Sequence, residues 1–159
     1  MPHRKCLAAL LLAATLPAAA QDNPLARRTP ASILSLNGYW NGANLESRSN
    51  CTTAGVNGNH GTYAQYLFSA SASATGGGTL HIHETTESGL TCDWDGGYAD
   101  DRLVPVWTGT LACSDGKQAT FTSTSFLITP TEMQVRAQMK WSNSELCDVD
   151  AILGGSRFN

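Results

Sequence analysis

The chain has 159 residues, of which 42% are hydrophobic and 14% are charged, and its formal net charge is −3 at pH 7. This length predicts a single domain. The acidic balance argues against a protein that binds nucleic acid or an anionic membrane, because such a protein would normally carry a basic patch or stripe.

The first 20 residues predict a secretory signal peptide. Arg4 and Lys5 precede an apolar run from Cys6 to Leu16, and the segment closes with small residues that end at Ala20. The apolar run is shorter than the roughly 20 residues that a bilayer span requires. We therefore expect cleavage after Ala20 and export to the periplasm or the extracellular space, without a membrane anchor.

The remaining sequence divides into a flexible leader and one domain. Residues 21–35 contain two prolines and two arginines but no regular hydrophobic period, which is typical of a loose leader. Residues 36–159 carry the alternating patterns of a β domain. We expect this domain to be a monomer.

Four cysteines remain after the signal peptide, and they predict two disulfides. An even number of cysteines in an exported chain is typical of a disulfide framework, and four cysteines allow three connectivities. None of them forms a C-x-x-C pair, which argues against a thioredoxin-like redox site or a zinc ribbon. The four are Cys51, Cys92, Cys113 and Cys147.

The segment Glu132–Trp141 shows the clearest strand pattern in the chain. Every second residue from Met133 is apolar and every residue between is polar, so one face of this strand is dry and the other is wet. The residue pattern predicts seven further strands, which are separated by clusters of Gly, Asn and Ser. They are Gly38–Leu45, Gly61–Ser73, Gly78–Thr86, Leu90–Asp95, Leu103–Cys113, Ala119–Thr129 and Cys147–Leu153.

About eight short strands joined by turns predict an all-β fold. An antiparallel meander of this length closes into a small β-barrel or packs as a β-sandwich, and we favour the closed barrel. No segment outside the signal peptide shows a helical period.

Two features at the ends of the domain support the barrel. Gly38, Tyr39 and Trp40 open the first strand as G-x-W, and Arg157 lies near the end of the chain. In these positions the chain resembles the lipocalin/avidin-like (calycin) barrel superfamily. The resemblance implies that Trp40 packs at the barrel floor beneath a basic side chain from the end of the fold, and that the interior holds a small ligand.

His81 and His83 form a candidate metal site. Residues two apart on a strand share one face, so both imidazoles can reach one divalent ion. Leu80 and Ile82 occupy the other face, which places the histidine pair on the wet side if the leucine and isoleucine face the core. His60 is the third histidine of the mature chain and a possible third ligand.

The segment 93–101 is a candidate binding loop. Four aspartates and two aromatic residues crowd a connection that contains glycines, although their spacing does not match a calcium-binding EF-hand. Exposed aromatic residues beside acidic groups are typical of surfaces that grip a protein partner. The residues are Asp93, Trp94, Asp95, Tyr98, Asp100 and Asp101.

These features favour a binding protein over an enzyme. The chain has no G-x-S-x-G elbow, no phosphate-binding glycine loop and no H-E-x-x-H motif. The first hypothesis is recognition or inhibition of another protein, as by a hydrolase inhibitor or an immunity protein, with Trp94 and Tyr98 exposed. The alternatives are a lipocalin-like carrier of a small ligand, which requires a cavity, and a protein that binds a divalent metal through His81 and His83. No cofactor is expected apart from that metal.

Overall fold

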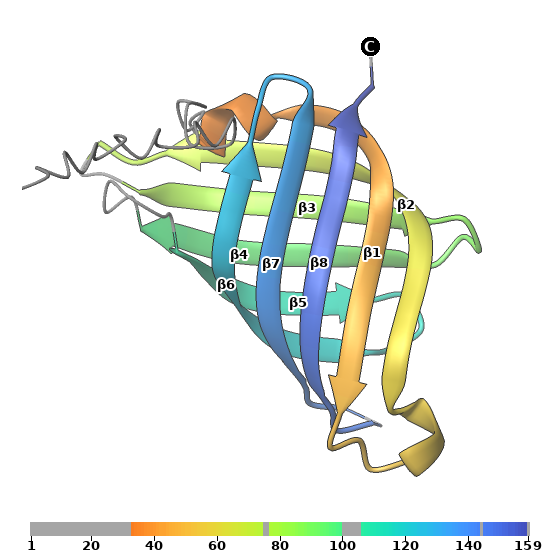
Figure 1. Ribbon diagram of the computed structural model, residues 1–159. Coiled ribbons are helices and arrows are strands. Elements are labelled where there is room, and N and C mark those ends of the chain that lie inside the picture. Colours follow the sequence, from red (N-terminus) through yellow and green to blue (C-terminus); the bar gives the residue numbers. More distant parts are fainter. Residues whose placement is uncertain (1–32, 75–76, 100–105, 144, 159) are drawn as a thin grey trace, which may run out of the picture.

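The computed structural model describes residues 33–74, 77–99, 106–143 and 145–158. Eight antiparallel strands pair in chain order, and the last pairs with the first, which closes a barrel (Figure 1). The prediction of a closed barrel is therefore confirmed, and the alternative of a β-sandwich is excluded. The strands are β1 (Gly38–Ser49), β2 (Gly58–Ala72), β3 (Gly78–Thr86), β4 (Thr91–Ala99), β5 (Val106–Cys113), β6 (Gln118–Ile128), β7 (Glu132–Trp141) and β8 (Asp148–Arg157).

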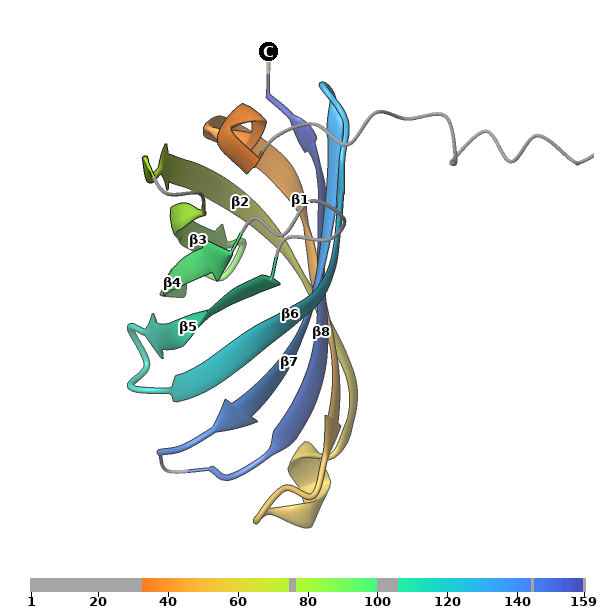
Figure 2. The same cartoon turned by 90° about the vertical axis from the view of Figure 1, so that its left-hand side faces the viewer.

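The barrel is strongly twisted. One wall contains β1, β7 and β8, and these strands run across the direction of β3, β4 and β5 in the opposite wall (Figures 1 and 2). The period-two pattern decides which side chains fill the space between the walls. In β7 the predicted apolar set Met133, Val135, Ala137, Met139 and Trp141 is buried, which confirms the orientation of that strand.

Aromatic side chains fill the interior away from the barrel mouth. Trp107 contacts Phe121 with ring centroids 4.2 Å apart and stacks on Trp94 at 6.1 Å. The Trp107 indole also donates a 3.1 Å hydrogen bond to the Leu80 carbonyl of β3, although β4 lies between the two strands. Gly96 of β4 permits this crossing, because a Cβ there would lie 2.6 Å from Trp107 Nε1.

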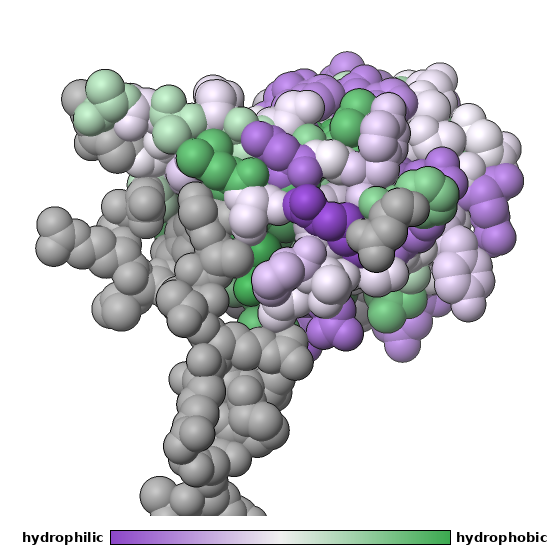
Figure 3. Space-filling view, turned by 90° about the horizontal axis from the view of Figure 1, so that it is seen from above, coloured by the Kyte–Doolittle hydropathy of each residue, from purple (hydrophilic) through white to green (hydrophobic). Residues whose placement is uncertain are grey.

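The floor of the barrel is closed by η1, a 3-10 turn over Ile33–Leu36. Trp40 is fully buried beside this turn and donates a 2.7 Å hydrogen bond from Nε1 to the Leu36 carbonyl. The Arg157 guanidinium lies 4.9 Å from the centre of the Trp40 ring and donates to the carbonyls of Ser35 and Asn37. The predicted position of Trp40 under a terminal basic side chain is confirmed. Seen from this end, hydrophobic and hydrophilic residues are interleaved on the surface (Figure 3).

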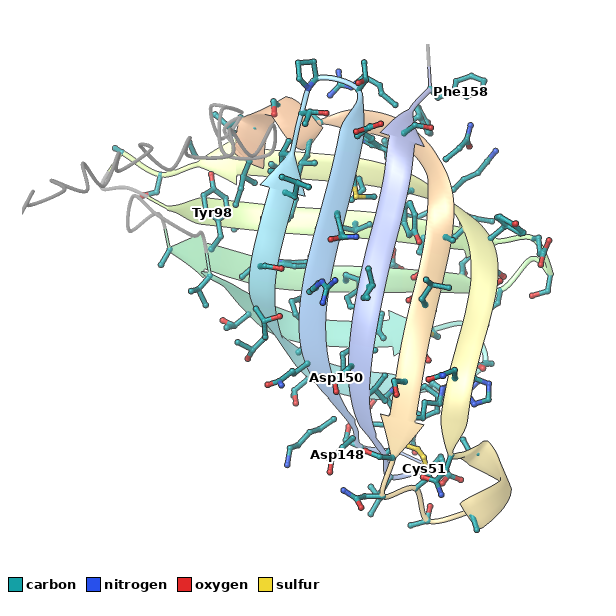
Figure 4. All side chains as sticks on the ribbon, in the orientation of Figure 1. Cys51, Tyr98, Asp148, Asp150 and Phe158 are labelled. Atoms are coloured by element: carbon teal, nitrogen blue, oxygen red, sulfur yellow. A yellow bond between two sulfur atoms is a disulfide. The ribbon has the colours of Figure 1, made fainter. Side chains whose placement is uncertain are left out.

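Two disulfides tie the opposite end, which forms the barrel mouth. Cys92 and Cys113 are directly opposite each other on β4 and β5, and they are bonded. Cys51, which follows β1, is bonded to Cys147, which precedes β8 (Figure 4). The predicted number of disulfides is confirmed, and the connectivity that the sequence left open is Cys51–Cys147 with Cys92–Cys113.

The acidic segment differs from its prediction as a loop. Residues 93–99 continue β4, because alternation persists through "DWDGGYA" with Trp94 and Tyr98 inward and Asp93 and Asp95 outward. The polar segment before β2 also holds a short 3-10 turn, η2 (Ala54–Val56).

Several sequence predictions fall outside the residues that the structure describes. They are the signal peptide over 1–20, most of the leader over 21–35, the start of the strand predicted at Leu103, and Asp100 and Asp101. Within the described ranges, none of the helices is long and apolar enough to cross a membrane.

Candidate ligand site in the barrel mouth

A cavity of about 300 Å³ occupies the mouth end of the barrel interior. Its walls come from the ends of the strands and from the turns between β3 and β4 and between β5 and β6. The volume lies at the lower end of the range for small-molecule sites. The residues that line it are Asn44, Glu46, Arg48, His60, Gly61, Thr62, Glu84, Thr86, Ser88, Leu90, Cys92, Trp94, Leu111, Cys113, Lys117, Gln118 and Trp141.

Glu84 brings a carboxyl group into this cavity. It follows Leu80 and Ile82 on the inward face of β3, and only 2% of it is exposed. Trp94 Nε1 donates a 2.9 Å hydrogen bond to Oε2, and Asn44 Nδ2 donates a 3.3 Å hydrogen bond to Oε1. Burial raises the pKa of the Glu84 carboxyl above its ordinary value, and the two hydrogen bonds offset part of this effect.

Two further polar atoms near Glu84 are buried without a hydrogen-bond partner among the described residues. One is the hydroxyl of Tyr66, which lies opposite Glu84 in the pairing of β2 with β3. The other is Oδ1 of Asn44, a residue that is 7% exposed and lines the cavity. Burial and the neighbouring Glu84 and Glu46 raise the pKa of Tyr66, so its hydroxyl keeps its proton and remains available as a donor.

The charged side chains nearer the opening already have partners. Arg48 Nη2 lies 2.7 Å from Glu46 Oε2, and the guanidinium lies 4.4 Å from the centre of the Trp141 ring. Lys117 forms an ion pair with Asp115. In contrast, no cation of the described residues forms an ion pair with Glu84. The cavity therefore combines a polar rim of neutralised charges with a deeper carboxyl group that has no counter-ion in the part of the chain that the structure describes.

His81 and His83 lie on the outer face of the barrel, as their alternation with the buried Leu80 and Ile82 predicts. The neighbouring strand supplies a carboxylate to each: Asp95 Oδ1 lies 2.6 Å from His81 Nδ1, and Asp93 Oδ1 lies 2.7 Å from His83 Nδ1. Asp93 Oδ1 is also 3.7 Å from His81 Nε2. This arrangement is a ladder of histidine–aspartate pairs across β3 and β4.

His60 is not brought to this pair. It lines the cavity mouth, and its Nε2 lies 2.9 Å from the Val56 carbonyl. Within the described residues, no group of three potential metal ligands includes a histidine. The group that does converge, Cys51, Glu145 and Cys147, contains a disulfide, so its sulfur atoms are not free thiolates. Metal binding by His81 and His83 stays a prediction.

The prediction that Trp94 and Tyr98 form an exposed aromatic patch is wrong, because both side chains are buried. Trp94 is fully buried against Trp107 and Glu84, and Tyr98 is 8% exposed with its hydroxyl donating to the Ser71 carbonyl at 3.0 Å. Figure 4 places Tyr98 away from the mouth that Cys51 marks. Asp93 and Asp95 do face outward, but without the two aromatic anchors.

Glu84 was not among the predicted site residues, although the strand pattern contains the signal for it. Glu84 stands in the same alternation as Leu80 and Ile82, so the assignment that put the histidines outside also puts this carboxyl inside. A charged residue on the dry face of a strand is rare unless it is paired, which makes it informative. Asn44, four residues after Trp40 on the inward face of β1, carries the same kind of signal.

No protein-family model matches the chain, and a search of curated proteins finds no relative. Among solved structures, a redesigned β-barrel, mFAP1, bound to DFHBI is similar at 12% identity over 76% of this chain and 95% of that chain, with a TM-score of 0.42. The structure of EF1p2_mFAP2b bound to DFHBI is similar at 12% identity over 78% of this chain and 94% of that chain, with a TM-score of 0.45. Likenesses of this degree do not assign a ligand to this chain.

Proposed function

We propose that this protein binds a small molecule in the mouth of its barrel. The observation that carries the proposal is a cavity of about 300 Å³ with a buried carboxyl group, Glu84, and a second polar group, Asn44, on its wall. A few placed polar groups in a concave cavity are typical of small-molecule sites. The carrier hypothesis drawn from the sequence required such a cavity.

A pair of substitutions on β5 tests this function. Leu111→Phe adds volume on the cavity wall, whereas Thr110→Phe adds the same ring to the exposed outer face one residue away. Native mass spectrometry of protein purified from the compartment of export reports any retained small molecule. We expect the wild type and Thr110→Phe to retain it and Leu111→Phe to lose it. Equal retention by all three proteins would place the ligand elsewhere.

Recognition of a protein partner ranks second. Trp94 and Tyr98, the aromatic residues of the predicted patch, are buried in the barrel interior. Exposed aromatic anchors supply much of the binding energy of a protein interface, so their burial weakens this hypothesis. Asp93 and Asp95 are the outward-facing remainder of the patch among the described residues. Loss of a co-purifying protein in the variant Asp93→Asn with Asp95→Asn would support this alternative.

The histidine–aspartate ladder keeps the metal hypothesis testable. A carboxylate on Nδ1 fixes an imidazole so that Nε2 can act as a ligand, which is the common arrangement in metal sites. Titration of Zn²⁺ into the wild type and into His81→Ala with His83→Ala measures whether the pair binds the ion. Equal heats in the two proteins would leave the ladder as ordinary surface.

A further inference from the structure

The charge balance of the cavity indicates which class of molecule fits it. The two cations on its wall, Arg48 and Lys117, are each paired with a carboxylate, Glu46 and Asp115 respectively. An anionic ligand would have to compete with these ion pairs. Glu84, in contrast, is the carboxyl on the wall that lacks a cationic partner among the described residues.

The hydrogen-bonding atoms of Glu84 and its neighbour Asn44 agree with the charge balance. Each Glu84 oxygen accepts one hydrogen bond from the protein and retains capacity for another, because a carboxylate oxygen can accept two. Asn44 Oδ1 is an acceptor that has no hydrogen-bond partner among the described residues, in a side chain that is more than nine-tenths buried. The free hydrogen-bonding capacity of Glu84 and Asn44 is therefore that of acceptors, which favours a ligand that brings N–H donors to these two side chains.

We infer that the cavity binds a small organic cation whose protonated primary amine donates hydrogen bonds to the Glu84 carboxylate and to Asn44 Oδ1, beside the hydrogen bond that already joins these two side chains. A primary ammonium carries three donors and one positive charge, which matches these two side chains. Trp94, Leu111 and the Cys92–Cys113 disulfide provide an apolar wall for the rest of the molecule. This inference rests on the proposed ligand-binding function and adds the chemical class of the ligand.

Matched probes separate the charge of the ligand from its shape. Phenethylamine, 2-phenylethanol and phenylacetate differ mainly in the end group, and so do butylamine, butanol and butyrate. Binding is measured by calorimetry and by the fluorescence of Trp94 and Trp141, which line the cavity. We expect at least one amine to bind about tenfold or more tightly than its alcohol and its carboxylate, because a charged hydrogen bond contributes more than a neutral one.

Two variants assign this preference to Glu84. Glu84→Gln keeps the size of the side chain and removes its charge, whereas Glu87→Gln makes the same change at an exposed position just beyond β3. We expect Glu84→Gln to weaken amine binding about 10- to 100-fold and to leave alcohol binding nearly unchanged. Glu87→Gln should bind as the wild type does. Circular dichroism checks that both variants fold.

A measurement on the wild type covers the case in which Glu84→Gln fails to fold. The ¹³C resonance of the Glu84 carboxyl, followed against pH, should titrate at lower pH with the amine than without it, because a bound cation favours the ionised carboxyl.

The outcomes distinguish the two proposals. If the alcohols or carboxylates bind as tightly as the amines or more tightly, the proposal of a cationic ligand is overturned. If Leu111→Phe abolishes that binding, the cavity is still supported as the binding site. An unchanged Glu84 titration in the presence of a bound amine would also overturn the proposal of a cationic ligand. No binding by any of the probes would count against both proposals.

Discussion

The buried carboxyl of Glu84 makes the stability of the protein depend on pH. Its pKa in the folded protein is raised by burial, whereas in the unfolded chain it should be near the ordinary value of about 4.3. Between these two pKa values the folded protein binds more protons than the unfolded chain, so stability falls as pH rises through this window. The stability is fully present below the unfolded pKa and is lost as pH passes the folded one.

A pH series on the Glu84→Gln variant isolates this effect. We expect the free energy of unfolding of the wild type, relative to the variant, to decrease from pH 4 to pH 8, because glutamine does not titrate. Urea unfolding at several pH values in this range measures the difference. Asp115 and Asp148, whose pKa values are lowered by hydrogen bonds and Lys partners, contribute the opposite slope at low pH in both proteins. Parallel stability profiles would show that Glu84 does not titrate abnormally.

At the scale of elements, β1 and β8 approach closely where both strands carry glycine. A Cβ on Gly42 of β1 would lie 1.9 Å from the Gly154 carbonyl oxygen of β8, whereas a Cβ on Gly154 would meet nothing within 4 Å. Gly42→Ala should therefore destabilise the protein by about 1–3 kcal/mol, as overpacking does. Gly154→Ala is the matched control and should change stability by less than about 0.5 kcal/mol. Thermal unfolding compares them, and similar losses would contradict this packing.

The elements also show which sequence signals were sufficient. Gly78–Thr86 and Glu132–Trp141 were predicted with the observed bounds, because Gly or Pro lies near their ends. The alternation of Glu132–Trp141 is also uninterrupted. β4 was cut short at Asp95, since "DGG" resembles a turn and glycine is usually depleted in strands. The glycines belong there because Gly96 leaves room for the Trp107 indole, a contact between distant residues that no local pattern contains.

The candidate site was less predictable than the fold. Alternation indicates which face a side chain occupies, so the positions of the histidines and of Glu84 follow from the sequence. The cavity does not, because it depends on how eight strands twist around one another and where large side chains leave space. The connectivity of the disulfides is a second example, since it depends on which strand ends meet at the mouth.

At the scale of the whole molecule, the two disulfides should contribute unequally to stability. Cys51 and Cys147 are 96 residues apart in sequence, whereas Cys92 and Cys113 are 21 apart. Loop-closure entropy predicts losses of about 4–5 kcal/mol for Cys51→Ala with Cys147→Ala and about 3 kcal/mol for Cys92→Ala with Cys113→Ala. Urea unfolding of the two double variants measures both. A larger loss from the Cys92–Cys113 pair would show that strain or residual structure outweighs chain entropy.

The two ends of the described chain meet at the floor of the barrel, which makes a circular permutation of the domain possible. Arg157 reaches the Ser35 carbonyl, and the amide of Phe158 donates to the Tyr39 carbonyl at 3.0 Å, so the two ends of the described chain meet beneath the barrel. A short Gly/Ser linker from residue 158 to residue 33 would join them without crossing the interior. New termini opened in the turn over residues 87–90 would then lie at the rim of the cavity. The result would be a circular permutant in which the same strands pair but follow one another in a different order along the chain.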